Sequence, residues 1–180
     1  MTSVRLFLCL AIAAAACDSA QEGGAPEPGT ELYAINPEDV REVVFTAPEH
    51  RLYAYRWSPT DTFQITAATR GRTEVERCAA GAGFQRWLTA VARMPIERKL
   101  DRPFEPRGAE WTDLRLRDTT DLEPIDVRLR VPVANDEPVV LQSGAHQYAV
   151  AVDAVTLRSA RSGCAALGSV AVAAPASLPR

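Results

Sequence analysis

The segment Ile125-Asp126-Val127-Arg128-Leu129-Arg130-Val131 decides the fold class, because its apolar and charged residues alternate without a break. Successive side chains of an extended chain point to opposite faces, so a period of two predicts a strand with one buried and one solvated face. The same period surrounds Leu114 and Leu116, whose polar neighbours are Asp113, Arg115 and Arg117. The sequence therefore predicts a sheet whose polar side carries arginines.

Other segments with strand patterns lie on both sides of this pair. On the N-terminal side they are residues 42–46, 51–57 and 63–67, separated by proline-containing turns. On the C-terminal side, residues 139–142 and 147–152 flank Ser143-Gly144 and predict a hairpin. Strands joined by short turns in this way indicate a largely antiparallel sheet.

Helical spacing occurs in one long segment. Phe84, Trp87, Leu88 and Val91 follow each other at i, i+3, i+4 and i+7, which predicts an amphipathic helix that packs on the sheet and ends before Pro95. Asp153 stands where the N-cap of a short C-terminal helix is expected. The predicted fold is thus α+β, with a largely antiparallel sheet, one amphipathic helix packed on it, a short C-terminal helix, and a polar connection over residues 97–110.

The N-terminus has the layout of a secretory signal peptide. Arg5 is followed by an uncharged apolar run from Leu6 to Ala16, which ends in four alanines before Cys17. This run is far shorter than the roughly 20 residues that a transmembrane helix needs. We therefore expect residues 1–16 to be removed after export.

The residues Ala14-Ala15-Ala16-Cys17 resemble a lipobox, the processing site of bacterial lipoproteins, although Ala14 stands where the strongest motifs have leucine. The resemblance implies that Cys17 is diacylated and holds the protein to a membrane, with its body in the periplasm or outside the cell. The alternative is a soluble secreted protein that keeps Cys17 as an ordinary thiol. Asp18 resembles the inner-membrane retention signal of some Gram-negative lipoproteins, and the choice between inner and outer membrane stays open.

Composition divides the rest of the chain into three parts. Residues 17–31 are rich in Gly, Pro, Glu and Ala and predict the lipidated cysteine with a flexible tether. Residues 32–167 are expected to form a single α+β domain, since two domains would be cramped in this length. Residues 168–180 are expected to be a disordered tail, with one last short strand around residues 170–172 as the alternative.

The cysteines suggest a disulfide. Cys9 leaves with the leader, and if Cys17 is lipidated, then Cys78 and Cys164 remain as a pair in an oxidising compartment. The alternatives are two buried free thiols, or a redox role for the pair.

Charge and motifs argue against several functions. The formal net charge is only -3, so nucleic acid is not an expected partner. The two histidines, His50 and His146, lie near predicted turns without metal-ligand spacing, and no metal or cofactor is expected. Ser143 and His146 are read as turn residues rather than members of a catalytic triad.

Two groups of side chains are hypotheses for a binding surface. Tyr53, Tyr55 and Trp57 share one face of a predicted strand and could stack on a sugar or anchor a protein, or else form the floor under the helix, which is the favoured interpretation. Four arginines could form a patch for phosphate headgroups or an acidic partner, or else pair across strands with Asp113 and Asp126: Arg115, Arg117, Arg128 and Arg130.

The layout of Asn36-Pro37-Glu38-Asp39-Val40, the strand ending at Trp57, the helix through Trp87 and the late run Leu141 to Leu157 resembles an uncharacterised domain. That domain occurs in bacterial envelope proteins, some of them encoded beside gliding-motility-type ABC-transporter components, and it implies no catalytic motif. The sequence therefore favours a non-enzymatic lipoprotein that acts as a structural or protein-binding module. The alternative is an envelope protein that binds or hydrolyses glycans or peptides.

Overall fold

A computed structural model describes residues 28–119 and 123–171. Within them, eleven strands form one sheet in the order β1-β6-β10-β9-β8-β7-β2-β3-β4-β5-β11. Every pairing between neighbours is antiparallel. The strands are β1 Glu31–Ala34, β2 Val40–Thr46, β3 His50–Tyr55, β4 Gln64–Thr69, β5 Val75–Ala80, β6 Arg93–Lys99, β7 Glu110–Asp118, β8 Ile125–Val131, β9 Val139–Ser143, β10 His146–Val150 and β11 Gly168–Ala171. The α+β class with a largely antiparallel sheet agrees with the sequence.

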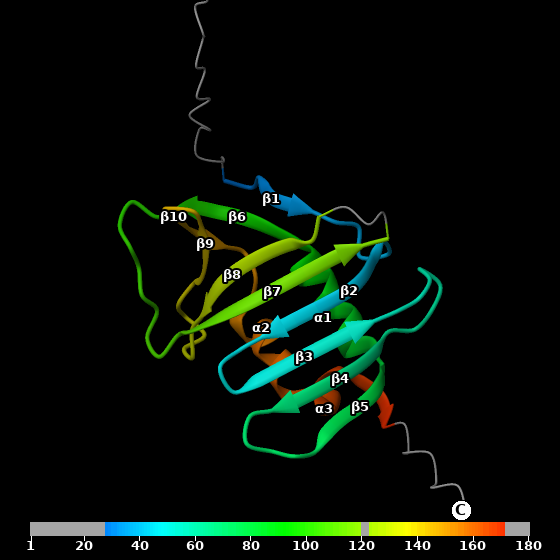
Figure 1. Ribbon diagram of the computed structural model, residues 1–180. Helices are drawn as coiled ribbons and strands as arrows, with labels where there is room; N and C mark the ends of the chain where they lie inside the picture. The colour runs from blue at the N-terminus through cyan, green and yellow to red at the C-terminus, as the bar shows by residue number, and fades with distance from the viewer. Residues whose placement is uncertain (1–27, 120–122, 172–180) are drawn as a thin grey trace, which may run out of the picture.

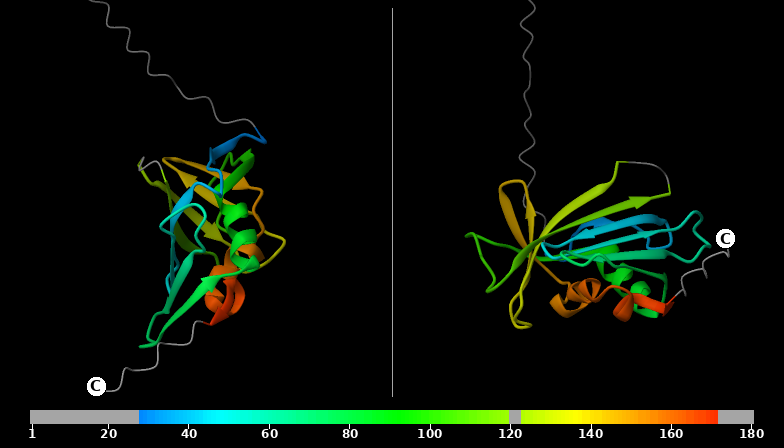
Figure 2. Two further views of the ribbon diagram at one scale, coloured as in Figure 1. Left: turned by 90° about the vertical axis from the view of Figure 1, so that its right-hand side faces the viewer. Right: turned by 60° about the horizontal axis from the view of Figure 1, so that its bottom comes forward.

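The helices gather on one side of the sheet, and the other side is left uncovered over β4, β3, β2 and β7 (Figures 1 and 2). They are α1 Ala82–Ala92, α2 Ala154–Ser159, a 3-10 turn at Ala160–Ser162 and α3 Cys164–Leu167. The core lies between the two layers. There, the ring of Trp87 meets the edge of Phe45 at 5.9 Å, and Phe84 meets Phe63 at 4.9 Å between ring centroids.

The sequence prediction of one long helix and one short closing helix is too simple. The C-terminal segment is divided, because Gly163 takes a positive φ of 53° between the 3-10 turn and α3. This arrangement places α3 and β11 against the start of α1. A Cβ atom on Gly83 would lie 2.1 Å from the carbonyl oxygen of Ala166, so only glycine allows the two segments to approach this closely.

Besides the short terminal strands β1 and β11, β5 and β6 occupy segments that were not expected to be strands. Helix α1 ends at Ala92, and β6 begins at once, contains Pro95 and extends to Lys99, so the polar connection expected over residues 97–110 is shorter and covers residues 100–109. Pro95 still contributes its carbonyl oxygen, which accepts from the Ala151 N–H at 2.9 Å. Strand β5 was missed as well. It pairs with β4 on one side and with β11 on the other.

The chain ends differ from the expected boundaries. Gly29 donates its N–H to the Ile96 carbonyl at 2.6 Å and β1 starts at Glu31, so ordered pairing begins inside the expected tether. Residues 168–171 form β11 rather than part of a disordered tail, which agrees with the alternative of a last short strand. The expected signal peptide, Cys17 and residues 172–180 lie outside the described residues. No helix in the described part of the chain is long and apolar enough to cross a membrane.

The expected disulfide is present. Cys78 in β5 and Cys164 at the first position of α3 are bonded, with their Cα atoms 5.9 Å apart. The Cys78 side chain is buried, which favours a structural bridge over a redox centre that exchanges with an external thiol. The bond fixes the helical layer to the sheet at β5.

Asp153 caps α2 as the sequence predicts. Its carboxylate accepts the backbone N–H groups of Thr156 at 2.9 Å and Val155 at 3.2 Å. Burial alone would raise the pKa of Asp153, but these hydrogen bonds and the charge of Arg158 lower it overall.

Replacing Asp153 by alanine is expected to lower the free energy of unfolding by about 1 kcal/mol at pH 7, as for other lost N-caps. Because the folded-state pKa is depressed, the stabilisation is complete above the ordinary carboxyl pKa and disappears as the pH falls through the folded-state value. Urea unfolding at pH 7 and pH 3 measures this. A difference between wild type and variant that grows on acidification would contradict the assignment.

Candidate functional site

Tyr53, Tyr55 and Trp57, which we call the aromatic stripe, lie on the opposite side of the sheet from the one favoured by the sequence. Tyr53 is 38% exposed and Trp57 is 79% exposed, whereas Leu52 and Ala54 are buried. The interpretation of Tyr53, Tyr55 and Trp57 as the floor under the helix is therefore wrong. Leu52 and Ala54, on the opposite side of β3, belong to the core, and β3 contacts the helical layer at the 3-10 turn, so the stripe remains available as a surface.

Arg56 explains why the sequence does not show which alternate side chains of β3 face the core. Its side chain follows Leu52 and Ala54 into the protein and is only 8% exposed. The guanidinium donates to the carbonyl oxygens of Val40, Pro59, Pro37 and Glu38 at 2.5 to 3.1 Å. It also lies 4.6 Å from the ring centroid of Phe63. A buried charge with this many acceptors holds the loop before β2 and the turn after β3 together.

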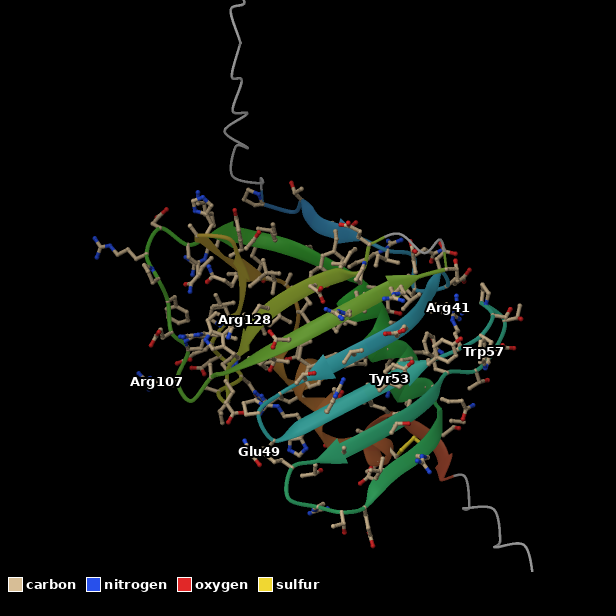
Figure 3. All side chains as sticks on the ribbon, viewed as in Figure 1. Arg41, Glu49, Tyr53, Trp57, Arg107 and Arg128 are labelled. Atoms are coloured by element: carbon tan, nitrogen blue, oxygen red, sulfur yellow. A yellow bond between two sulfur atoms is a disulfide. The ribbon has the colours of Figure 1, made fainter. Side chains whose placement is uncertain are left out.

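We call the side of the sheet opposite the helices the open face. Strand register arranges its side chains in rows, and the row through Tyr53 runs from β5 to β8 as Arg77, Thr66, Tyr53, Val44, Arg115 and Asp126. The middle of the open face is hollowed, with a volume of about 590 Å³. Figure 3 shows Tyr53, Trp57 and Arg41 toward one end of this face and Arg128 toward the other.

The three aromatic side chains form a continuous contact. The rings of Tyr53 and Tyr55 are parallel with centroids 6.4 Å apart, and Tyr55 meets Trp57 edge-on at 5.1 Å. The guanidinium of Arg41 lies 5.6 Å from the Tyr55 ring centroid and donates to the Tyr55 hydroxyl at 3.1 Å. Only Tyr53 also lines the hollow. The stripe therefore leads from the hollow to the loop after β3.

The four predicted arginines all lie on the open face, and two of them pair across strands. Arg115 and Asp126 form two hydrogen bonds, at 2.6 and 3.0 Å, and Arg128 is 3.7 Å from Asp113. Both pairs are well exposed, so each contributes little to stability. Cross-strand pairing thus accounts for Arg115 and Arg128.

The other two predicted arginines have different surroundings. Arg130 is 2.9 Å from Glu105, which reaches over from the segment between β6 and β7. Arg128 and Arg130 both lie over the ring of Trp111, at 4.7 and 4.4 Å from its centroid. Arg117 has a buried Nε without a hydrogen-bond partner among the described residues.

Sequence reasoning missed several residues that the open face brings to the same surface. Glu42 and Arg51 line the hollow together with Asp113 and Asp126. Arg77 extends the row through Tyr53 by two strands. The sequence pattern could have identified Arg51, because this residue lies two positions before Tyr53 and therefore shares its side of the strand. Arg77 gave no such signal, because β5 itself was not recognised.

The hollow offers a ligand both charged groups and a hydrogen-bond donor. Burial raises the pKa of Tyr53, and the charge of Glu42 raises it further, so the phenol stays protonated at neutral pH and can donate a hydrogen bond. The lining residues include carboxylates and arginines but no Ser, Cys or His. Within residues 28–119 and 123–171, no three His, Cys, Asp or Glu side chains are grouped so that they could hold a metal ion.

Comparison of the chain with protein-family models, with curated proteins and with solved structures gives no match. The fold and the open face must therefore be interpreted from their own geometry.

Proposed function

We propose that this protein is a lipoprotein of the cell envelope whose folded domain is a non-enzymatic module that binds a partner protein through the open face. The observation that carries the proposal is the uncovered sheet surface with exposed aromatic and arginine side chains beside a hollow of about 590 Å³. Tyr, Trp and Arg are the residues that most often dominate the binding energy of protein interfaces. Exposure of Trp57 in particular costs hydrophobic free energy that a partner would recover.

The membrane anchor is the other half of the proposal. The apolar leader that ends at Cys17 supports it, and so does the Cys78–Cys164 disulfide, since such bonds persist in oxidising compartments. The anchor restricts the domain to a layer near the membrane, where a modest affinity for a membrane-bound partner is sufficient.

Mass spectrometry of the protein purified from its native membrane tests the anchor. We expect a mature chain that begins at Cys17 and carries acyl groups, and we expect Cys17→Ser to leave the chain unprocessed and without lipid. Serine retains the size of the side chain but cannot form the thioether. A native product that begins at Met1, or one that begins at Cys17 without acyl groups, would show that the anchor is absent.

Affinity purification from detergent-solubilised membranes tests the binding surface. Wild type is compared with Tyr53→Ser/Trp57→Ser on the open face and with Val155→Ser, which removes an exposed apolar side chain of α2 on the helical side. We expect the open-face variant to recover about ten-fold less partner. Each aromatic side chain that is buried in an interface typically contributes about 1 kcal/mol or more to the binding free energy. The helical-side variant should recover as much as wild type. Equal recovery by all three proteins, or no partner with any of them, would contradict the proposal.

A glycan- or peptide-binding protein, or a hydrolase that acts on one of these polymers, is the second candidate. The observation in its favour is the hollow, which brings Tyr53 together with the carboxylates of Glu42, Asp113 and Asp126. It ranks lower because Tyr55 and Trp57 do not line the hollow, and because Asp113 and Asp126 are both engaged by arginines. Binding of a soluble cell-wall oligosaccharide that is lost in Tyr53→Ser would favour this candidate.

A further inference from the structure

Positive charge is concentrated on the open face of a chain whose overall charge is negative. Among the described residues, seven arginines contribute side chains to this face, against four carboxylates, which gives these groups a formal charge of +3, whereas the whole chain carries -3. The arginines are Arg41, Arg51, Arg77, Arg115, Arg117, Arg128 and Arg130, and the acids are Glu42, Glu105, Asp113 and Asp126. The two signs are thus separated across the molecule, which favours an acidic partner for this side.

Three of these arginines have no carboxylate partner within the described residues. Asp113, Asp126 and Glu105 are engaged by Arg128, Arg115 and Arg130, respectively, and Arg41 contacts Tyr55. This leaves Arg51, Arg77 and Arg117. Arg51 and Arg77 are exposed.

The three unpaired arginines surround Tyr53. Arg51 is two residues away on β3, and Arg77 lies two strands away in the same row, which corresponds to roughly 10 Å. Arg117 belongs to the neighbouring row, which passes through Glu42 to Tyr55. Unpaired charges therefore lie along β3 from Tyr53 and on both sides of it across the sheet.

The aromatic residues indicate a protein rather than a simple polyanion. Two of the three tryptophans of the chain, Trp57 and Trp111, lie outside the core, and Trp111 is on the open face beside Arg128 and Arg130. An interface rich in Tyr, Trp and Arg and without lysine has the composition of a protein-binding surface.

The ion pairs inside the hollow lead to the same choice. Asp113 and Asp126 lie between the unpaired arginines and the far end of the face, and they would repel a polymer that is negative at every repeat. A protein segment can place carboxylates beside Arg51, Arg77 and Arg117 and neutral side chains beside the existing pairs. A hollowed face also fits a protruding chain segment better than a flat lipid surface.

Resting on the proposed function, we infer that the partner docks an acidic protein segment on the open face. Its carboxylates bind Arg51, Arg77 and Arg117, and its neutral side chains pack on Tyr53 and Trp57. Guanidinium groups suit this role because each can form two parallel hydrogen bonds with one carboxylate.

A binding assay with defined polymers tests the inference. The full lipidated chain in non-ionic detergent is titrated into a fluorescent random copolymer of glutamate and tyrosine, with a lysine–tyrosine copolymer of equal length as the control of opposite charge. Arg51→Glu/Arg77→Glu is compared with Arg86→Glu/Arg93→Glu, which changes the net charge equally at exposed positions of α1 and β6. Polyuronate and phosphatidylglycerol vesicles are added as competitors that share the negative charge.

We expect wild type to bind the glutamate–tyrosine copolymer at least ten-fold more tightly than the lysine–tyrosine copolymer, with an affinity that weakens as salt is added. The open-face variant should lose about ten-fold in affinity, and the control variant less than three-fold. Arg51→Gln/Arg77→Gln removes charge without reversing it and should fall between them, which guards against a folding defect. Equal losses in the two glutamate variants would overturn the inference. Tighter binding of polyuronate or vesicles than of the copolymer would overturn its protein part.

The outcome is separable from that of the proposed function. If the copolymer fails to bind while recovery of a membrane partner still depends on Tyr53 and Trp57, only the acidic character of the partner is wrong. If that recovery is also independent of the open face, the proposed function fails with it.

Discussion

Reduction of the Cys78–Cys164 disulfide is expected to lower the free energy of unfolding by about 4 kcal/mol. The bond joins residues separated by 86 positions, and a cross-link over so long a loop strongly restricts the unfolded chain. It also fixes α3 to β5, and the Cys164 N–H donates to the Glu76 carboxylate at 3.1 Å beside it. Loss of the bond therefore affects the point where the helical layer meets the sheet.

Urea unfolding with and without a reducing agent measures this effect. Wild type should be destabilised by the reductant, and the double variant Cys78→Ala/Cys164→Ala should be weak in both conditions and insensitive to it. Cys78 is buried, so part of the loss in the variant comes from the space left by sulfur, and the reductant comparison isolates the bond. A wild-type midpoint that the reductant does not change would mean that the pair does not constrain the folded protein.

Replacing Arg56 by alanine is expected to cost about 3 kcal/mol, which corresponds to a fall of roughly 10 °C in Tm. The guanidinium supplies hydrogen bonds to four carbonyl groups on the segments around Pro37 and Pro59, and alanine leaves these acceptors without a donor. Burial lowers the pKa of Arg56, while the nearby Asp39, Glu38 and Asp61 oppose this effect, so the group stays charged at any ordinary pH.

Two controls separate geometry from charge at this position. Arg56→Lys keeps the charge but cannot reach four carbonyls with one ammonium group, so it should recover no more than about half of the lost stability. Arg51→Ala removes an exposed arginine of the same strand and should change stability by less than about 0.5 kcal/mol. If Arg56→Ala were as stable as Arg51→Ala, the central role of this guanidinium would be wrong.

The strongest local patterns were sufficient to predict much of the sheet. The alternation at residues 125–131 predicts β8 with Val127, Leu129 and Val131 buried, as observed. The helical spacing of Phe84, Trp87, Leu88 and Val91 likewise identifies the buried side of α1. In these segments every position agrees on a single period, so no tertiary information is needed.

Strands β5 and β6 could not be predicted in the same way. β5 reads Val75-Glu76-Arg77-Cys78-Ala79-Ala80, with its first positions exposed and charged and its last ones small. β6 contains Pro95, which weakens any strand interpretation, and it follows α1 without an intervening turn. Both segments become strands because they pair with neighbouring strands, and the disulfide also holds β5. Such constraints are tertiary.

The most consequential error of the sequence prediction concerns which side of β3 faces the core. Either alternation set of this strand contains apolar residues, and the larger aromatics suggested the wrong one. The deciding residue is Arg56, whose burial depends on carbonyl groups supplied by the loop before β2 and the turn after β3. No pattern within the strand encodes that partnership. The open face was therefore only half visible in the sequence, through Arg115, Arg117, Arg128 and Arg130.

Photo-crosslinking in cells that make the protein tests the open face most directly. A benzoylphenylalanine is placed at Thr66, between Tyr53 and Arg77 in the row through Tyr53, and in a second protein at Arg86, an exposed position of α1. We predict a discrete protein adduct from position 66 that disappears in the Arg51→Glu/Arg77→Glu background, and none from position 86. Adducts of equal yield from both positions, or from position 86 alone, would contradict the account.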